Sequence, residues 1–511
     1  MSHSKNQKIS LWSIVLIIIA TEFGFSNIVT GYNQMGYASI IWYIITSIIF
    51  LFPLVMIFAE YSGSLESDHG GFYSWLINSI GEKGAFMGTF CWIGMILINV
   101  LQNCSGIGIN LSGIVYGQDV SQTWKLGSLN SNEIEALLGI IVIIVATFIA
   151  TKGVHQIAII STIAGIISLS VITIFVVASL IIFFANGHLA QPINGESFIK
   201  APNPQFQSPI AITSFIVYAM FAYGGIESSS GLIDKMKNPR KDYPKAVLIV
   251  AGVMTALYIL GIFICGLATN WTQVMGQKNV NLYNNGFYLM QNLGAGLVKA
   301  FGGSNALGMT VGAWLNRIFS IGSLIPLFGL LIVVTYSPIK GLIAGSSKDL
   351  WPKRIAHFNK HDVPSFAMWM ECALIVISLL LISLTGKNGQ QFYQIIVDMG
   401  NIGTLLPYIF IVVAFLAFKK RKDLSHPIVF FHSKASTYAA VFLLLASMAF
   451  AMVMNFIHPI LQHQYSVAFW TFAGPVLFLL ISAIMYHFGI HHRAKRMIID
   501  NVTYEKENQP S

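Results

Sequence analysis

The sequence predicts an all-α integral membrane protein with about twelve transmembrane helices. Of its 511 residues, 55% are hydrophobic and 10% are charged, whereas soluble proteins carry roughly 25% charged residues. The apolar residues form runs of about 20, the length that crosses the hydrocarbon core of a bilayer. These runs are too uniformly apolar for barrel strands, which alternate polar and apolar positions. The composition excludes a disordered chain and a nucleic-acid-binding protein, and it argues against a soluble multidomain enzyme.

Short polar segments separate the apolar runs, so each run is expected to cross the membrane once. The first run follows Lys5 and Lys8 and in this respect resembles a signal peptide. No cleavage site of small residues stands at a suitable place, and further runs follow, so we expect an uncleaved first helix. The twelve expected spans are 11–36, 38–59, 84–115, 134–151, 154–185, 208–233, 244–268, 314–338, 364–384, 390–418, 434–457 and 465–490.

The distribution of positive charge predicts the orientation of these spans. With the N-terminus inside, the inner segments hold 23 of the 29 Lys and Arg residues and the outer loops hold five (Lys125, Lys200, Lys278, Lys299 and Lys387). Lys and Arg are retained on the cytoplasmic side of a membrane. We therefore expect both termini, 1–10 and 491–511, to be cytoplasmic. The outer segment 269–313 is expected to contain a short helix within 281–301, and the tail after His491 is expected to be disordered.

Two of the expected spans are interrupted by glycine and polar residues in mid-membrane. Residues 22–27 read Glu-Phe-Gly-Phe-Ser-Asn, and residues 223–231 read Tyr-Gly-Gly-Ile-Glu-Ser-Ser-Ser-Gly. Non-helical backbone at membrane depth is tolerated where it is buried in protein or lines a cavity, and such interruptions at matching places in two halves mark transporter binding sites. The alternative is that the small residues allow close helix packing. We favour the binding site, because each interruption has an acid beside it.

The interruptions fall in the first and sixth spans, about 200 residues apart. This spacing fits two five-helix repeats of opposite orientation, 11–185 and 208–418, followed by two additional helices at 434–490.

Three motifs, in order along the chain, resemble those of one transporter superfamily. The motifs are 59–61 (Ala-Glu-Tyr) with 70–75 (Gly-Gly-Phe-Tyr-Ser-Trp), 223–227 (Tyr-Gly-Gly-Ile-Glu) with 236–246 (Met-Lys-Asn-Pro-Arg-Lys-Asp-Tyr-Pro-Lys-Ala), and 347–352 (Ser-Lys-Asp-Leu-Trp-Pro) with 359–364 (Asn-Lys-His-Asp-Val-Pro). They resemble the amino acid–polyamine–organocation superfamily, and the Asn-Pro-x-x-Asp-Tyr-Pro run is most similar to its glutamate/GABA antiporter branch. Within that branch the chain looks most like bacterial inner-membrane transporters of unassigned substrate.

This resemblance implies a five-plus-five inverted repeat, alternating access, and an amino acid or amine carried at the two broken helices. In such folds the free N–H groups and the positive helix end at a break hold a substrate carboxylate. Carried over, the substrate-binding positions here are Phe23, Gly24, Phe25 and Ser26 in the first span and Ala222, Tyr223, Gly224, Gly225 and Ile226 in the sixth.

Three intramembrane acids are candidates for proton coupling, because ionisable residues at this depth are costly and functional by default. Glu227 matches the superfamily acid implicated in proton or pH coupling. Glu22 departs from the small-residue run usual in the superfamily, and it would repel a substrate carboxylate or attract an amine. It is therefore also a candidate substrate-binding residue, unless it faces the outer vestibule. Asp398 shares a helix face with Asn401 and Thr404, where a structural hydrogen bond is the alternative to a gating or proton role.

We therefore expect a secondary transporter of amino acids or related amines in the bacterial cell membrane, working by antiport or proton coupling. A polyamine or cationic-substrate permease is the alternative within the class, and a transporter-fold sensor or a membrane enzyme is the alternative outside it. Partners are the small-molecule substrate, the lipid bilayer and protons, and no nucleic acid is expected. The four cysteines lie unpaired in apolar runs and no nucleotide-binding P-loop is present, so no disulfide, metal, cofactor or enzymatic activity is expected. The sequence does not specify an oligomeric state.

Overall fold

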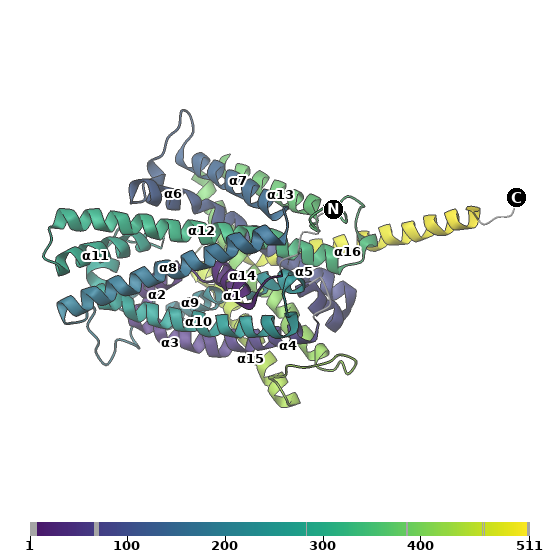
Figure 1. The fold of residues 1–511 in the computed structure, drawn as a ribbon, viewed down its shortest axis with the longest axis horizontal. Coiled ribbons are helices and arrows are strands. Elements are labelled where there is room, and N and C mark those ends of the chain that lie inside the picture. The colour runs from purple at the N-terminus through teal and green to yellow at the C-terminus, as the bar shows by residue number, and fades with distance from the viewer. Residues whose placement is uncertain are drawn as a thin grey trace.

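The computed structural model describes residues 8–65, 71–282, 284–384, 387–461, 463 and 465–507, with the main chain alone at 105, 214, 384–402, 458 and 491–507. The described chain forms an elongated helical bundle (Figure 1). The start of the first helix and the end of the last lie at the same end of this bundle, which we call the terminal end. At the opposite end, the loop end, lie α11 and the connection between α8 and α9.

The first six spans are formed by nine α-helices, one π-helical turn and one 3₁₀-helix in the described chain. In chain order they are α1 (Leu11–Glu22) and α2 (Phe25–Met35), then α3 (Ser39–Thr46), the π-helical turn η2 (Ser47–Leu51) and α4 (Phe52–Ser64), then α5 (Phe72–Ser105) with α6 (Ile107–Tyr116), α7 (Ser131–Ala150), α8 (Val154–Asn186), and α9 (Pro209–Ala222) with the 3₁₀-helix η5 (Ile226–Lys235).

The remaining spans are mostly uninterrupted helices. They are α10 (Pro239–Ala268), α12 (Asn305–Gly345), α13 (Ser365–Leu384), α14 (Lys387–Phe418), α15 (Lys434–Leu461) and α16 (Tyr465–Glu507), while the π-helical turn η6 (Trp271–Met275) and α11 (Asn285–Ala300) lie between α10 and α12. Short 3₁₀ turns η1 (Gly36–Ala38), η3 (Ser121–Thr123), η4 (Pro204–Phe206) and η7 (Lys348–Leu350) complete the elements.

Each of the twelve expected spans coincides with a helix or a helix pair in the described chain. Ten helical stretches are long and apolar enough to cross a membrane, and two shorter apolar helices, Leu11–Glu22 and Gly403–Phe418, belong to the expected first and tenth spans. The expected helix within 281–301 is present as α11 and packs on α12. Large apolar side chains on α7, α8, α15 and α16 are exposed, as on a surface that faces lipid.

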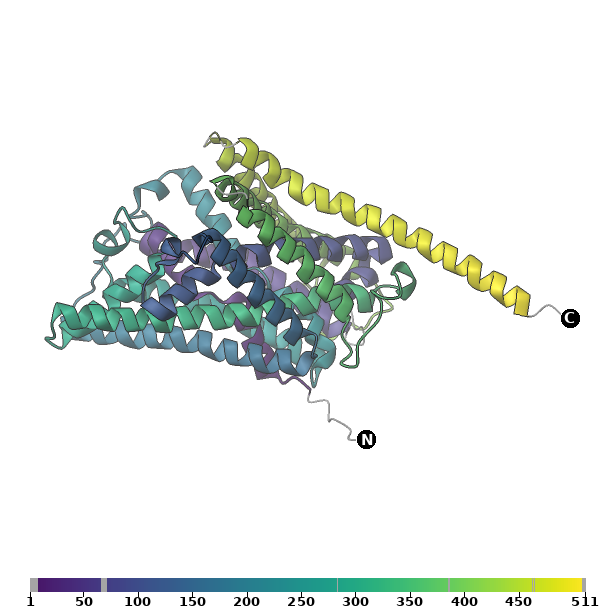
Figure 2. The ribbon, with the colours of Figure 1, turned by 90° about the horizontal axis from the view of Figure 1, so that it is seen from above.

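The structure corrects several expected boundaries. The eighth span was expected at 314–338, but α12 has 41 residues, because Ser304 caps its start by accepting a hydrogen bond from the Leu307 amide (3.3 Å) and helical geometry persists beyond the apolar core. Similarly, α5 begins at Phe72, with a kink at Gly81 before the part expected to cross the membrane. The tail after His491 was expected to be disordered, but α16 continues as a helix to Glu507, projecting past the bundle (Figure 2).

The three sequence motifs meet at the terminal end. The Phe72 amide donates to the Ser230 hydroxyl (3.2 Å), which connects the first motif to η5. The Lys235 ammonium lies 3.0 Å from the Asp362 carboxylate, which connects η5 to the third motif. The first and third motifs are therefore joined through η5, which connects the two parts of the second motif.

Candidate functional site

The first span is interrupted where the sequence predicts it. The helix α1 ends at Glu22, Phe23 and Gly24 adopt extended backbone, and α2 begins at Phe25. The first amide groups of a helix have no acceptor within it, so the N–H groups of Phe25 and Ser26 are available to a ligand. The helix dipole adds a partial positive charge at the same place.

The sixth span is interrupted at the paired glycines. The helix α9 ends at Ala222, and η5 continues from Ile226 as a 3₁₀-helix. Gly225 has a φ of +111°, which favours glycine, and a Cβ atom there would lie 1.8 Å from the Glu22 Oε2 atom. The carboxylate of the first interruption therefore packs directly on the main chain of the second.

Side chains from two other helices connect the interruptions. The Tyr258 hydroxyl on α10 donates to the Ala222 carbonyl (2.9 Å), which is left free at the end of α9. It also accepts a hydrogen bond from the Asn27 amide nitrogen (3.2 Å) on α2, and Asn27 Oδ1 in turn accepts from the Tyr218 hydroxyl (2.8 Å) on α9. This network satisfies polar groups that the broken helices would otherwise leave unpaired.

The two acids at the interruptions have different surroundings. Glu227 is 4% exposed, and its Oε2 atom accepts a hydrogen bond from the Tyr408 hydroxyl (2.7 Å) on α14. The same hydroxyl accepts a hydrogen bond from the Gly225 amide. By contrast, the buried Oε1 atom of Glu22 has no hydrogen-bond partner among the described residues. Glu22 thus has one buried carboxyl oxygen without a described donor at the junction of the two spans.

A cavity of about 480 Å³ opens at this junction. Its lining includes Glu22 and Glu227, five carboxamide side chains, and apolar side chains from α5, α9, α12 and α14. No Lys, Arg or His is among the described residues that line it. Its polar lining residues are Thr21, Glu22, Asn27, Asn99, Gln102, Asn103, Tyr218, Glu227, Ser228, Thr404 and Asn455.

The predicted substrate-binding positions fall into two groups. Four of them line the cavity, namely Glu22, Ala222, Gly224 and Gly225. The side chains of Phe23, Phe25 and Tyr223 pack on other aromatic rings: Phe23 stacks on Tyr258, Phe25 contacts Phe175 and Phe319, and Tyr223 contacts Tyr43 and Tyr258.

The other predicted positions have different environments. Ser26 is exposed and Gly24 is half-buried, and neither they nor the buried Ile226 belong to the lining. Asp398 lies on α14, and its side chain falls outside the described part of the chain.

Several residues at the site were not predicted from the sequence. Hydrogen bonds at the interruptions involve Tyr218 with Asn27, and Tyr408 with the Gly225 amide. Trp92 lines the cavity. A tyrosine inside an apolar span is a usable signal, because a buried hydroxyl normally has a partner. The Asn99 carboxamide on α5 lines the cavity and also donates to the Thr404 hydroxyl (3.2 Å) on α14, so the same side chain bonds two helices and faces the cavity.

Two buried ion pairs lie at the terminal end. The Lys340 ammonium on α12 is 2.6 Å from Asp234 Oδ1 and donates to the Gly231 carbonyl (3.0 Å), which ties α12 to η5. The fully buried Glu60 carboxylate on α4 lies 2.8 Å from the Lys419 ammonium, just after α14. These contacts join neighbouring spans on the side of the interruptions away from the loop end.

Paired broken spans around a polar cavity in a bundle of membrane-crossing helices define a transporter of the broken-helix class. The comparisons with known proteins give the family: the amino acid permease family matches residues 9–483, and the chain belongs to it. The chain is 36% identical to the "Inner membrane transporter YjeM" of Escherichia coli (strain K12) over 482 residues, covering 94% of this chain and 96% of that protein.

More distant relatives carry named substrates. The "Aspartate/glutamate permease AcaP" of Lactococcus lactis subsp. cremoris is 23% identical over 431 residues, with 76% of this chain and 83% of that protein covered. The "Glutamate/gamma-aminobutyrate antiporter" of Lactococcus lactis subsp. lactis is 20% identical over 416 residues, with 78% and 76% covered. Membership of the family makes this chain a multi-pass membrane transporter of the amino acid permease type.

Proposed function

We propose that this chain carries a neutral or cationic amino acid, or a related amine, across the bacterial cell membrane by alternating access. The observation that supports this most directly is the cavity at the two interruptions, which has two carboxyl side chains and no basic side chain among its described lining. Family membership supports the transport of amino acids, and the two carboxyl groups that line the cavity support a neutral or cationic substrate.

In the proposed orientation the terminal end faces the cytoplasm and the loop end faces outward. The segments expected inside from the sequence carry 23 of the 29 Lys and Arg residues, and positive residues are retained on the cytoplasmic side. The ion pairs of Lys340 and Glu60 then lie on the cytoplasmic side of the cavity. Opening toward the cytoplasm would have to separate α12 from η5, which these contacts oppose.

An amino acid substrate would bind chiefly at the first interruption, beside the cavity. Its ammonium group would bind the free Oε1 atom of Glu22. Its carboxylate would bind the amide groups of Phe25 and Ser26 at the positive end of α2. The carboxamides of the cavity would bind a polar side chain. The acceptor, Glu22, and the donors, the amides of Phe25 and Ser26, are thus within five residues of one another in the sequence.

A polyamine or another cationic substrate is the second candidate. Two carboxyl groups in one cavity, with no basic side chain among its described lining, attract positive charge and repel negative charge strongly at low dielectric. An acidic amino acid would add a further negative group there. It would therefore require protonation of Glu22 or Glu227, and we expect glutamate to be a poor substrate at neutral pH.

Proton coupling would act through Glu227, with Glu22 and Asp398 as the further candidates. Binding a proton on Glu227 would remove the charge to which Tyr408 donates. Because the same hydroxyl accepts from the Gly225 amide, the change would reach the main chain of the sixth interruption. Glu22 and Glu227 share a cavity, so they are expected to titrate as a pair.

Counterflow uptake in proteoliposomes tests the function. Liposomes preloaded in turn with glutamate, GABA, glutamine, leucine, arginine and putrescine would be assayed at mildly acidic and at neutral pH. We expect neutral or cationic compounds to accelerate uptake and glutamate to do so weakly at neutral pH. Efficient glutamate exchange at neutral pH would contradict the proposed substrate charge, and no counterflow with any compound would contradict amino acid exchange itself.

Matched variants separate the roles of the two acids. Glu22→Gln should lower arginine counterflow relative to glutamine by about tenfold, the effect of losing one charge-assisted contact. Glu227→Gln should instead flatten the pH dependence of uptake. If the two variants had the same effect on substrate preference and on pH dependence, the separate assignments would be wrong.

A further inference from the structure

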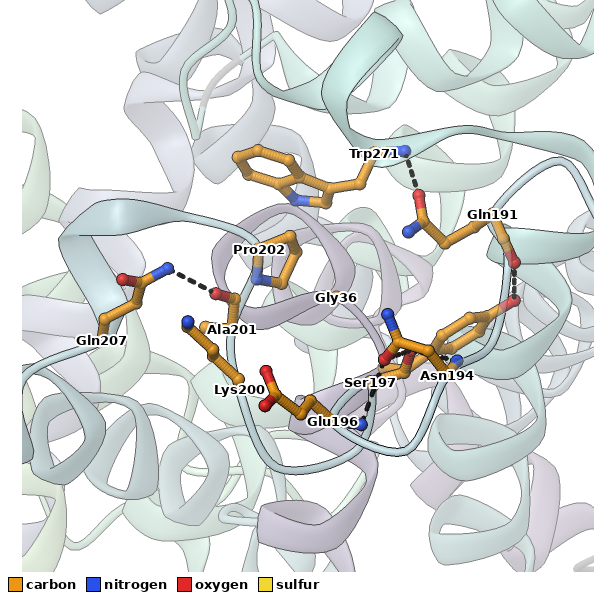
Figure 3. A pocket seen from close by; sticks show the side chains of 11 residues that line it. Gly36, Gln191, Asn194, Glu196, Ser197, Lys200, Ala201, Pro202, Gln207 and Trp271 are labelled. Atoms are coloured by element: carbon orange, nitrogen blue, oxygen red, sulfur yellow. Dashed lines mark hydrogen bonds between the residues drawn. The ribbon is translucent and has the colours of Figure 1, made fainter.

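A second pocket lies at the loop end, away from the central cavity. It has a volume of about 210 Å³ and shares no described lining residue with the cavity at the interruptions. Figure 3 shows its walls, which come from the end of the first span, the connection between α8 and α9, and the start of η6. None of these residues has a part in the proposed transport site.

The pocket is held together by hydrogen bonds between these three segments. The Trp271 amide donates to Gln191 Oε1 (2.8 Å), and the Tyr37 hydroxyl donates to the Gln191 carbonyl (3.3 Å). The indole nitrogen of Trp271 donates to the Asn33 carbonyl (2.9 Å) on α2. Trp271 and Tyr37 are both buried, so the apolar wall of the pocket is fixed.

The end of the first span forms part of the floor. Gly36 has a φ of +56°, and a Cβ atom there would lie 2.8 Å from Pro202 Cγ. The connection between α8 and α9 therefore rests directly on the main chain where the first span turns into the second.

Two opposite charges lie at one side of the pocket. The Lys200 amide donates to the Glu196 carbonyl (2.8 Å), so the two residues are one turn apart. Asn194 Oδ1 holds this turn by accepting from the Glu196 amide (3.0 Å). In Figure 3 the Glu196 carboxylate and the Lys200 side chain lie across the pocket from the Trp271 indole. Neither charged group forms an ion pair with a described residue, so both are available to a ligand.

We propose that this pocket binds a small zwitterion, such as a free α-amino acid. The ammonium of the ligand pairs with Glu196, its carboxylate pairs with Lys200, and its side chain lies toward Trp271. An α-amino acid fits because its two charges are attached to one carbon, which matches two residues one turn apart. The volume has room for on the order of ten non-hydrogen atoms, which suits a single amino acid and excludes a drug-sized ligand.

Occupancy would affect transport from outside the central cavity. The ligand bridges the α8–α9 connection to the wall formed by Trp271 and Tyr37, and these segments contact the end of the first span. It would therefore hold the loop end of α2 in place. This makes the pocket an external amino acid sensor that is independent of the substrate bound at the interruptions.

Fluorine NMR of the full chain in lipid nanodiscs tests the proposal. With 5-fluorotryptophan incorporated, the Trp271 resonance is identified by its loss in Trp271→Phe. We expect L-alanine to shift this resonance, while propionate and ethylamine at equal concentration, each lacking one charge, do not. If propionate or ethylamine shifts the signal as strongly as alanine, or if glycine, alanine, glutamine and leucine all leave it unmoved, the proposal is overturned.

Variants at the exposed charges identify the contacts without disturbing the fold. Glu196→Gln and Lys200→Gln should each raise the half-saturating alanine concentration by about tenfold. The combined swap Glu196→Lys with Lys200→Glu should recover part of the loss, because the ligand can bind in reverse. Lys278→Gln, an exposed lysine outside the pocket, is the matched control. Equal effects of Lys200→Gln and Lys278→Gln would also overturn the proposal, whereas counterflow at the central cavity is expected to persist in every variant.

Discussion

The two interrupted spans accommodate non-helical backbone in the middle of the bundle in different ways. In the first span, two residues of extended backbone separate two regular α-helices. In the sixth, paired glycines lead into a 3₁₀-helix of ten residues, and the Tyr408 hydroxyl accepts from the Gly225 amide. The first interruption thus leaves helix-end amides available, while hydroxyl groups from other spans occupy polar groups at the sixth.

The two acids beside the interruptions, Glu22 and Glu227, also differ in their hydrogen bonding. Glu227 has a hydroxyl donor, whereas Glu22 has a buried oxygen without a described partner. A buried carboxyl that has its donor is held in one position, and one that lacks a donor costs free energy until a ligand or a proton binds. The comparison therefore supports the proposal that the first interruption binds the ligand and that the sixth couples its binding to the structure.

Gly225→Ala should have the largest effect, because it separates the two interruptions. The new Cβ atom would lie 1.8 Å from Glu22 Oε2, in a backbone conformation that favours glycine. Left-handed strain and overpacking together cost about 2–5 kcal/mol. We expect counterflow to be lost while the protein is still inserted, as measured by uptake and by membrane yield.

Gly252→Ala is the matched control, because a Cβ atom at that position of α10 meets no atom within 4 Å. Normal transport in Gly225→Ala would mean that Glu22 moves away without consequence, and the direct contact between the interruptions would then have no functional role.

Lys340→Met tests how the two half-helices at the terminal end are held. The start of α1 is tied to the end of η5 by main-chain bonds of Ile9 with Lys235 and Lys237 (2.9 and 3.0 Å), whereas η5 is tied to α12 by the Lys340 ion pair. Removing one partner of a buried pair costs about 3–5 kcal/mol. We expect Tm to fall by several degrees in a thermal unfolding assay.

The exposed Lys348, at the nearby turn η7, gives the control Lys348→Met, which should leave Tm unchanged. Equal Tm values for the two variants would show that the main-chain bonds of Ile9 suffice to hold the terminal end.

Tyr408→Phe should make the sixth interruption resemble the first. It removes the donor of Glu227 and the acceptor of the Gly225 amide while keeping the ring. An unpaired buried polar group costs about 1–3 kcal/mol, so we expect uptake to fall about tenfold and its pH dependence to change. Tyr438→Phe, at an exposed position on α15, should change neither property. An unaltered pH profile in Tyr408→Phe would argue against coupling through this hydroxyl.

Asp423→Asn should have the smallest effect, because it lies at the surface far from both interruptions. Hydrogen bonds from Arg421 lower the pKa of Asp423 to about 2. The stabilisation from this pair is therefore complete above the ordinary aspartate pKa of about 3.9 and is lost as the pH falls toward 2. Because both side chains are exposed, solvent screens this pair and its contribution is small, so we expect Asp423→Asn to change Tm by no more than about a degree between pH 5 and 8. A clear difference in that range would mean that the connection after α14 contributes to stability.

The positions of the interruptions were predictable, but their bonding was not. Glycines and acids inside apolar runs are visible in the sequence, and the structure interrupts the helices at these residues. Tyr408 is 181 residues from Glu227, and Asn27 is 231 residues from Tyr258. No local pattern relates such residues. The side-chain orientations of Phe23, Phe25 and Tyr223 could not be predicted either, because they depend on aromatic neighbours from other helices.

The sequence by itself determined which segments are long and apolar enough to cross a membrane and the places where two of them break. Both depend on local properties, namely the length of an apolar run and the presence of residues that tolerate non-helical backbone. The tertiary structure alone decided that Glu22 packs on Gly225, that Glu227 has a tyrosine donor while Glu22 Oε1 has no partner among the described residues, and that Glu196 and Lys200 face a common pocket. The reason is physical: a buried polar group takes its partner from whichever span packs against it, and packing is a property of the whole bundle.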